Sequence, residues 1–398
     1  MTALDWKKVQ EESTIVDLHI HPAMQQQLFQ RNLNLRYIIN RTLHGNPLNV
    51  QASFPRLRDG GYDVILSVLH VPEKGLLKDF PLIKIFSILR PDLWSKLMLT
   101  PPFDATLRMM GDMETAVADS KVYDQVKMAH SVGDLDAILS QPKGKRPIAV
   151  IHAVEGAHSL DSKQASEDEI LAHVDALYQR GVIYITLAHF YPNRIVHPCY
   201  PWPEDIVRLS ARPETWRDLT HGLTDLGIRV VERMVDLGML IDLSHSTPAA
   251  RQQIYEIIDT SGKHIPLLAT HVGAYGLNPS PYNLTDWEIQ RIARDGGVGG
   301  VIFMPYWLMP KSSGQGLNFI SRHIQYMINT GGEDFVAIGT DFDGFAIPPD
   351  DLDNASLMPR LTQRLIVDGY SLPQIKKILG ENALRAIRAG WGKKSSIN

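Results

Sequence analysis

The chain of 398 residues contains a single cysteine, Cys199. An internal disulfide is therefore excluded, and a lone thiol is typical of a reducing compartment. No apolar run approaches the roughly 20 residues that span a bilayer, and segment 1–13 is polar rather than a basic stub followed by an apolar run. We therefore expect a cytoplasmic protein without a transmembrane segment or a secretory signal.

An excess of basic charge is also absent. The formal net charge is -4, and residues of both signs are mixed along the sequence. Because nucleic-acid-binding proteins present a basic face, we expect neither DNA nor RNA as a partner. The sequence also lacks a Gly-x-Gly-x-x-Gly or Walker motif and a Gly-x-Ser-x-Gly elbow, so neither nucleotide binding nor serine hydrolase chemistry has support.

Short apolar runs rich in β-branched residues recur along the whole chain. They lack strict alternation of apolar and polar residues, which indicates strands buried on both faces, as in a parallel sheet covered by helices. The eight runs are 14–18, 63–69, 147–153, 182–187, 239–243, 265–269, 298–304 and 335–339.

Helical stretches with recognisable ends separate these runs. Ser166 and Glu169 form a capping-box pattern, Thr285 and Glu288 repeat it, and Gly238 ends a third stretch. Strand and helix therefore alternate. Eight such units predict an α/β fold, a (β/α)8 TIM barrel of the metal-dependent hydrolase type.

Two segments are longer than ordinary connections, about 24–56 after the first strand and about 72–130 after the second. Both are expected to be helical insertions. The second contains the apolar, proline-punctuated run 76–103, for which a lid, an oligomer contact, a membrane-surface patch and extra helices on the barrel rim are all open. No linker divides the chain, so we expect a single domain over 1–398.

Titratable residues follow six of the eight runs. Barrel enzymes gather their catalytic groups at this carboxyl end of the strands, so we expect these side chains to meet at one mouth. The residues at the ends of the runs or shortly after them are Asp17, His19, His21, Glu155, His189, His245, His271, Asp341 and Asp343.

The histidines predict a metal site. His19 and His21 are two apart on a strand, so they share a face and can bind one ion. Glu155 is the candidate bridge to a second ion. Burying these groups with His245 and His271 would be costly without a metal, and imidazole with carboxylate suits zinc and its neighbours. For Asp17, Asp242 and Asp343 a supporting or capping role is expected instead.

With these residues in this order, the chain resembles a known family, the membrane dipeptidases (renal dipeptidases), which are the M19 peptidases of the amidohydrolase superfamily. The resemblance extends from about Thr14 to Trp391, apart from 24–52 and 74–130. It is most specific in EGAHSL, LGMLIDLSH and IGTDFDG, which occur in that order. Other matching segments are VDLHIHP, YITLAHF, ATHVGAYGL, PYNLTD and ILGENALRAI.

The resemblance implies two divalent ions, for which zinc is the expected metal. His19 and His21 would bind one ion, His245 and His271 the other, and Glu155 would bridge them. His189 would orient the substrate carbonyl or stabilise its oxyanion. Asp341 would take a proton from the attacking hydroxide and return it. The resemblance also makes a homodimer an expectation.

Two departures from the family pattern bear on the substrate. The first motif is His-x-His, at His19 and His21, where the family usually has His-x-Asp. Tyr282 stands where characterised dipeptidases have an arginine that binds the substrate carboxylate, and a phenol cannot supply a cationic fork. Arg194 and Arg56 are the basic residues that could replace it.

We therefore predict a binuclear metal-dependent hydrolase that cleaves a dipeptide or a related small amide, with His189 and Tyr282 contacting the substrate. One alternative is a lactonase, esterase or N-acyl amino acid hydrolase of the amidohydrolase type. Another is a metal-binding assembly protein without turnover. Such a protein has no need for Asp341 and His189 beside the ligands.

Overall fold

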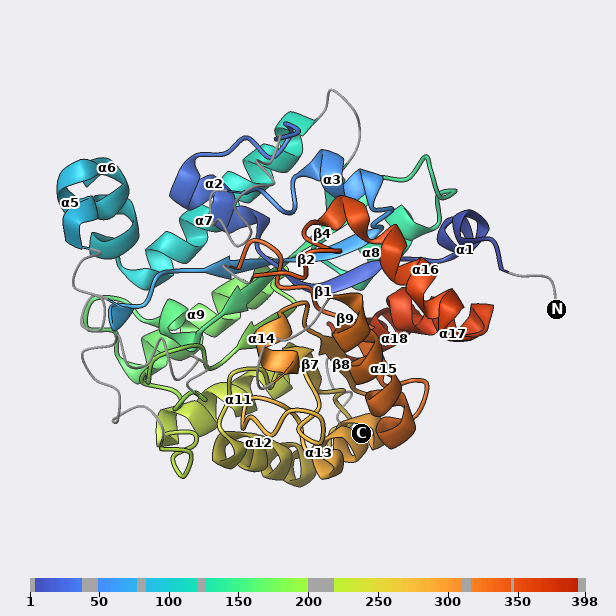
Figure 1. Ribbon diagram of the computed structural model, residues 1–398. Helices are drawn as coiled ribbons and strands as arrows, with labels where there is room; N and C mark the ends of the chain where they lie inside the picture. Colours follow the sequence, from blue (N-terminus) through green and yellow to red (C-terminus); the bar gives the residue numbers. More distant parts are fainter. Residues whose placement is uncertain are drawn as a thin grey trace.

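The computed structural model describes residues 4–37, 49–76, 84–120, 126–199, 218–309, 316–344 and 347–392. Within them, parallel strands curl into a nearly closed eight-stranded barrel ringed by helices, in the order β1-β2-β4-β5-β6-β7-β8-β9 (Figure 1). The strands are β1 (Val16–Ile20), β2 (Val64–His70), β4 (Ile148–Glu155), β5 (Tyr184–Thr186), β6 (Leu240–Asp242), β7 (Leu268–Val272), β8 (Val298–Val301) and β9 (Val336–Ile338).

The predicted barrel is confirmed, with two differences in its strands. A ninth strand, β3 (Val126–Met128), pairs in parallel with β4 but is not part of the barrel. It was not predicted, because a strand of three residues inside an insertion gives no periodic signal. The strands β1, β4 and β7 continue two or three residues beyond their predicted ends. His19, Glu155 and His271 therefore lie within strands, because polar residues are tolerated there at the mouth of the barrel.

The seam between β9 and β1 is joined by residues that follow β9. The Asp341 N–H donates to the His19 carbonyl at 2.9 Å. The buried carboxylate of Asp17 accepts hydrogen bonds from the backbone N–H and the hydroxyl of Thr340, at 3.0 and 2.6 Å. The segment carrying Asp341 is therefore fixed to the strand that carries His19.

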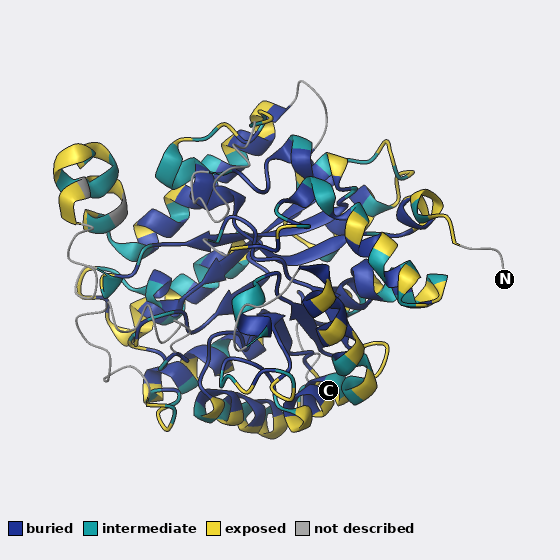
Figure 2. Cartoon of the chain, viewed as in Figure 1, coloured by how far each residue is buried: buried dark blue, intermediate teal, exposed yellow. Residues whose placement is uncertain are grey.

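The helices begin and end where the sequence predicts. Both capping boxes are present, at the start of α9 (Glu167–Gln179) and of α13 (Asp286–Arg294), and Gly238 ends α11 in the left-handed region. Buried faces are continuous from the strands to the inner sides of the helices (Figure 2). The other helices are α1 (Trp6–Glu12), α11 (Asp225–Leu237), α12 (Pro248–Ser261), α14 (Pro305–Leu308), α15 (Leu317–Gly331), α16 (Pro359–Val367), α17 (Leu372–Lys376) and α18 (Asn382–Gly390).

Both insertions contain helices, as expected. The first holds α2 (Pro22–Phe29) and α3 (Phe54–Asp59), although 38–48 lie outside the described residues. The second holds α5 (Phe86–Leu89), α6 (Pro91–Trp94), a π-helical turn (Ser95–Leu99) and α7 (Pro102–Asp119), followed by α8 (Val132–Leu139). The α7 helix packs against the barrel, whereas α5 and α6 stand away from it with Ile88 79% exposed (Figure 1).

Part of the run 76–103 lies outside the described residues. None of the helices in the described ranges is both long and apolar enough to cross a bilayer.

Candidate metal centre at the mouth of the barrel

Two pairs of imidazoles form at the carboxyl ends of the strands. His19 is in β1 and His21 follows it, held by its N–H to the Phe342 carbonyl at 2.8 Å, and their Nε2 atoms are 3.0 Å apart. His245 follows β6 and His271 is in β7, with their Nε2 atoms 2.9 Å apart. All four side chains are buried.

The carboxylate of Glu155 lies between the two pairs. Glu155 is the last residue of β4 and is 2% exposed. The Nε2 atoms of His19, His245 and His271 lie 3.2, 3.3 and 3.4 Å from its Oε1, and that of His21 lies 3.5 Å from its Oε2. The structure thus brings all five predicted metal ligands together around one carboxylate.

Hydrogen bonds fix the orientation of two of these rings. The Tyr184 hydroxyl donates to the Leu18 carbonyl, so its oxygen accepts the Nδ1–H of His19, at 2.9 Å. The Thr270 hydroxyl donates to Asp242, so its oxygen accepts the Nδ1–H of His271, also at 2.9 Å. With the hydrogen on Nδ1, the Nε2 of each ring presents a lone pair to Glu155, as metal-binding histidines do.

Charge in the cluster favours a cation between Glu155 and the rings. Burial opposes ionisation of Glu155, but His189 and His19 hold its pKa well below the usual range. Burial also opposes a charge on His19, yet Glu155 raises the pKa of His19. Burial, with His19 and His245 beside it, lowers the pKa of His271 well below its usual value. The ionised Glu155 therefore favours a cation in this cluster, although Glu155 is the only carboxylate among the five predicted ligands.

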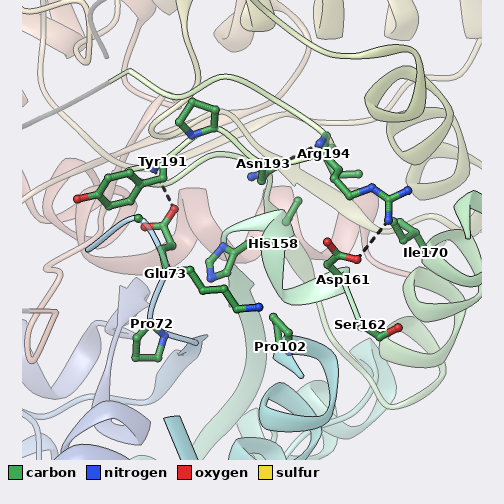
Figure 3. Close-up of a pocket in the computed structure, with 15 residues that line it drawn as sticks. Pro72, Glu73, Pro102, His158, Asp161, Ser162, Ile170, Tyr191, Asn193 and Arg194 are labelled. Atoms are coloured by element: carbon green, nitrogen blue, oxygen red, sulfur yellow. Dashed lines mark hydrogen bonds and ion pairs between the residues drawn. The ribbon is translucent and has the colours of Figure 1, made fainter. Parts of the chain in front are cut away.

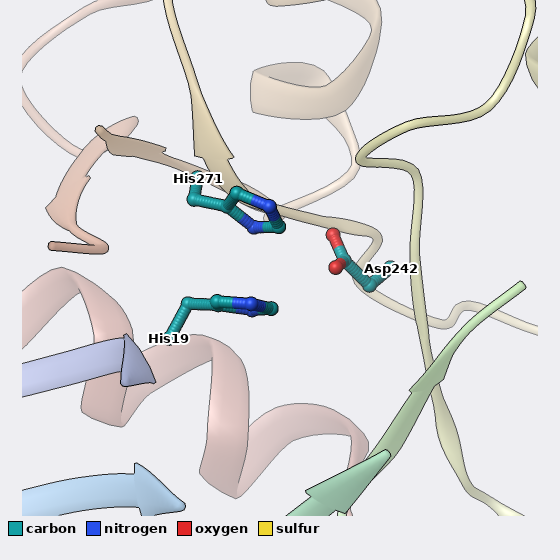
Figure 4. A group of neighbouring side chains, drawn as sticks. All are labelled: His19, Asp242 and His271. Atoms are coloured by element: carbon teal, nitrogen blue, oxygen red, sulfur yellow. The ribbon is translucent and has the colours of Figure 1, made fainter. Parts of the chain in front are cut away.

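Asp242 lies beside His19 and His271 (Figure 4) but is occupied by other donors. Its two oxygens accept hydrogen bonds from the hydroxyls of Thr186, Ser244 and Thr270 and from two backbone N–H groups. The carboxylate of Asp343 likewise accepts the N–H groups of Gln51 and Ala52, as Asp17 accepts that of Thr340. These three acids have the supporting geometry that we expected.

Two further predicted residues face the same cluster. His189, after β5, has its Nε2 3.7 Å from Glu155 Oε2. Asp341, after β9, has Oδ1 3.2 Å from His21 Nε2. Asp341 and His245 both have positive φ angles, 58° and 63°, an unfavourable conformation for non-glycine residues that is typical of functional sites.

Two glycines make room for these side chains. A Cβ on Gly344 would lie 2.0 Å from Asp341 Oδ1 and 2.7 Å from the ring of His21. Gly156, directly after Glu155, has a φ of 88°, and a Cβ there would meet the His158 ring at 2.3 Å. The glycines of the EGAHSL and TDFDG segments therefore have a steric role at the site.

Tyr282, the predicted substrate contact, is buried and bonded to the protein. It is 1% exposed, and its hydroxyl donates to the His271 carbonyl at 2.7 Å. Its ring stacks on Trp307 and meets that of His245 edge-on. The phenol therefore supports the end of β7, which carries the predicted ligand His271, and its contact with a substrate stays a prediction.

The two basic residues considered as replacements for the missing arginine are also engaged. The guanidinium of Arg194 donates to Asp161 and to the Ala165 carbonyl, at 3.2 and 2.7 Å (Figure 3). That of Arg56 donates to the Tyr37 carbonyl, and Arg56 is 8% exposed. Both guanidiniums therefore already have partners within the protein.

Sequence analysis missed four residues of the site. Tyr184 and Thr270 lie within strands, where an uncharged side chain gives no signal. His70, which ends β2, has its Nδ1 3.2 Å from the Glu155 carbonyl, and Glu73 follows three residues later. Both residues come at or after the end of the second apolar run, and titratable residues occupy the same position after six other runs. This position in the sequence could therefore have identified them.

Comparison with known proteins assigns the chain to a family. A family model described as membrane dipeptidase (peptidase family M19) matches residues 4–394. The chain belongs to this family. As a member of it, the protein is a metal-dependent hydrolase.

Curated relatives match about two thirds of the chain. An uncharacterized protein from the pqqA 5' region of Klebsiella pneumoniae is 34% identical over 66% of this chain and 92% of its own length. Dipeptidase tcpJ of Claviceps purpurea is 28% identical over 67% of this chain and 55% of its own length. Dipeptidase 3 of Mus musculus is 26% identical over 66% and 49%. The chain therefore spans about half the length of these two dipeptidases.

Solved structures share the fold over nearly the whole chain. Dipeptidase AC, a metallo peptidase of family M19, has a TM-score of 0.71 at 21% identity, covering 96% of this chain and 100% of its own. A metallo peptidase from Rhodobacter sphaeroides, solved with a phosphinate mimic of the dipeptide L-Ala-D-Ala, has a TM-score of 0.71 at 20% identity, covering 95% and 99%. These similarities support the barrel assignment.

Proposed function

We propose that this protein hydrolyses a dipeptide or a related small amide with two divalent metal ions, for which zinc is the best candidate. The observation that carries the proposal is the position of Glu155 between two imidazole pairs. Two nitrogens that each lie about 2.1 Å from a tetrahedral zinc are roughly 3.4 Å apart, close to the separations of 3.0 and 2.9 Å between the paired Nε2 atoms.

The donor set fits metal ions in its chemistry as well. His19 with His21 would hold one ion, His245 with His271 the other, and the Glu155 carboxylate would contact both. Tyr184 and Thr270 orient the neutral rings of His19 and His271 so that each Nε2 lone pair points at the ionised carboxylate of Glu155. This arrangement is unfavourable unless a cation lies between the nitrogens and the carboxylate. When bound, the ions would supply Lewis acidity and a water of lowered pKa.

The remaining side chains have separate roles in the proposed reaction. Asp341 lies within 3.2 Å of the His21 ligand atom, so its carboxylate is placed to take a proton from the attacking water and to return it to the leaving amine. Burial opposes a charge on His189, but Glu155 and Glu73 raise its pKa. In the imidazolium form Nε2, which lies 3.7 Å from Glu155 Oε2, also carries a hydrogen and can donate it to the oxyanion that develops on the substrate carbonyl. Burial of the whole cluster strengthens both interactions.

A second substrate class is favoured by the residue in the place of the family's arginine and by the two basic residues that could replace that arginine. Tyr282, Arg194 and Arg56 are each committed to protein carbonyls or carboxylates. A neutral amide or a lactone needs no such group, so these substrates belong in the same test as dipeptides. The Rhodobacter sphaeroides relative is known with a dipeptide mimic, which supports dipeptides as the first choice.

The test is a hydrolysis panel on zinc-loaded protein, with chelated protein as the control. The panel contains L,L and L,D dipeptides, the same dipeptides with an amidated C-terminus, N-acyl amino acids and lactones. We expect metal-dependent cleavage of free dipeptides. Cleavage of amidated dipeptides or lactones alone would assign the second substrate class, and no metal-dependent cleavage in the panel would contradict the proposal.

A further inference from the structure

A buried glutamate stands behind His189, on the side of the ring that faces away from the proposed metal site. Glu73 follows β2 and is 3% exposed. Its Oε2 lies 2.7 Å from His189 Nδ1. The same carboxylate accepts the backbone N–H groups of Phe190 and Tyr191, at 3.2 and 2.9 Å.

These contacts distinguish Glu73 from a metal ligand, although its carboxylate, His70 and His189 lie close enough together to suit one ion. Its two oxygens already accept hydrogen bonds from three donors in segment 189–191, the loop that follows β5 (the β5 loop). Burial opposes its ionisation, but His189 and its neighbours lower the pKa of Glu73 to about 2, so the carboxylate is charged. A charged acceptor at this position requires a hydrogen on His189 Nδ1 and sends Nε2 toward Glu155.

The loop that carries Glu73 is itself fixed. His158 donates from Nε2 to the Val71 carbonyl at 2.7 Å. A Cβ on Gly75 would lie 2.2 Å from the ring of Tyr191, so the two loops are packed in direct contact. Glu73 and His158 also line a cavity of about 360 Å³ (Figure 3), so Glu73 contacts both this cavity and His189.

We propose that Glu73 is a positioning residue for His189, which fixes the imidazole so that Nε2 faces the reacting carbonyl. This inference rests on the proposed function, because it assigns a partner to one of its residues. Glu73 acts through His189 and through the backbone of the β5 loop, without touching the substrate.

The test compares two matched changes, E73Q and E114Q. Glu114 contacts His152 Nε2 at 3.3 Å in another carboxylate–histidine pair, between α7 and β4, away from the ligand cluster. In E73Q we expect kcat to fall about 10- to 100-fold, as is typical for partners that orient a functional histidine, with KM within twofold. In E114Q we expect both constants within twofold of the wild type.

Two readouts exclude other roles for Glu73. Zinc content should be equal in wild type and E73Q, whereas a loss of one ion per chain in E73Q would make Glu73 a ligand and overturn the inference. In ¹⁵N spectra of histidine-labelled protein, with the His189 signals assigned from their absence in H189N, wild-type Nδ1 should be protonated. E73Q should change this signal, and E114Q should not.

The spectra separate the two proposals. If wild-type protein hydrolyses none of the panel, the proposed function fails, while the state of Nδ1 still decides whether Glu73 orients His189. If E73Q leaves kcat within twofold, or if wild-type Nδ1 carries no hydrogen, the positioning role of Glu73 is wrong, whatever the substrate.

Discussion

The two ends of the barrel bury charged groups in opposite ways. At the amino-terminal end, the carboxylate of Asp63 accepts hydrogen bonds from Lys143 and Arg146, at 2.9 and 2.8 Å, and from the Ile15 N–H. At the carboxyl-terminal end, the ion pairs of Glu155 within the described part of the chain are all with histidines.

The difference shows where the fold is complete without a ligand. The Asp63 cluster matches one buried carboxylate with two permanent cations, so it holds the strand ends together in the protein alone. The Glu155 cluster gathers neutral or partly charged imidazoles whose lone pairs converge, so it needs a cation from outside. The first cluster stabilises the barrel, and in the proposed function the second binds the ions that supply the chemistry.

The largest expected effect is on the Glu155 cluster. We expect E155Q to reduce hydrolysis by about 1000-fold or more, because the variant loses the charge that both proposed ions share and with it several kcal/mol of transition-state stabilisation. Unfolding of the metal-free protein in urea should change little. Turnover of E155Q near the wild-type rate would remove Glu155 from the mechanism.

The opposite pattern is expected for D63N. The change leaves Lys143 and Arg146 half-buried beside a neutral side chain, which should lower the free energy of unfolding by about 3 kcal/mol. Turnover per folded molecule should stay within twofold, with E155Q as the reciprocal control. If D63N were as stable as the wild type, the contrast between the two ends would not hold.

A smaller loss of rate is expected for D341N. The amide keeps the size of the side chain but cannot accept the proton, so kcat should fall about 100-fold, which corresponds to about 2.7 kcal/mol. Metal content should be unchanged. Equal kcat values for D341N and wild type would assign the proton transfer to another group.

His323 is a useful contrast to the Glu155 cluster, because it lies near the same mouth and both of its ring nitrogens have hydrogen-bond partners in the protein. Its Nδ1 accepts the Ala274 N–H at 2.9 Å and its Nε2 donates to the Leu308 carbonyl at 2.7 Å. Burial lowers the pKa of His323 from 6.5 to about 4. The unfolded chain therefore takes up a proton below pH 6.5 while the folded chain does not, so stability is lost as the pH falls toward 4.

Between pH 7 and pH 5 this linkage amounts to about 2 kcal/mol. Urea unfolding of metal-free protein at both pH values should show that the wild type loses about that much more stability than H323Q. Because each protein is compared at pH 7 and at pH 5, the stability lost with the hydrogen bonds of His323 is the same at both pH values and does not affect the difference. An equal loss in both proteins would show that His323 is protonated in the fold.

The smallest effect is expected for Y282F. Loss of the hydroxyl leaves the His271 carbonyl without this donor and should cost about 1 kcal/mol of stability. KM for dipeptides should stay within twofold, since the hydroxyl is committed to the protein. A tenfold rise in KM would return Tyr282 to the substrate-binding role that the sequence predicted.

Local signals were sufficient to predict the fold. Ser166 with Glu169 and Gly238 are short-range patterns whose hydrogen bonds close within a few residues, so they do not depend on the rest of the chain. The strand β3 and the extension of β4 through Glu155 depend on neighbouring strands, and local patterns do not contain that information.

The site could be predicted only in part, for the same reason. Its charged residues follow apolar runs and could be found from this position. Their orientation depends on residues distant in sequence, such as Tyr184 for His19 and Glu73 for His189. Tyr282 was assigned to the substrate because its position in the chain matched a family residue, whereas its buried hydroxyl is bonded to the protein.

The central claim is that four imidazoles and Glu155 bind two metal ions, and elemental analysis tests it most directly. Protein loaded with zinc and dialysed free of excess should retain about two ions per chain, and E155Q should retain less than one while D63N retains two. Wild-type protein that retains no zinc, or an E155Q variant that retains two ions, would contradict the account.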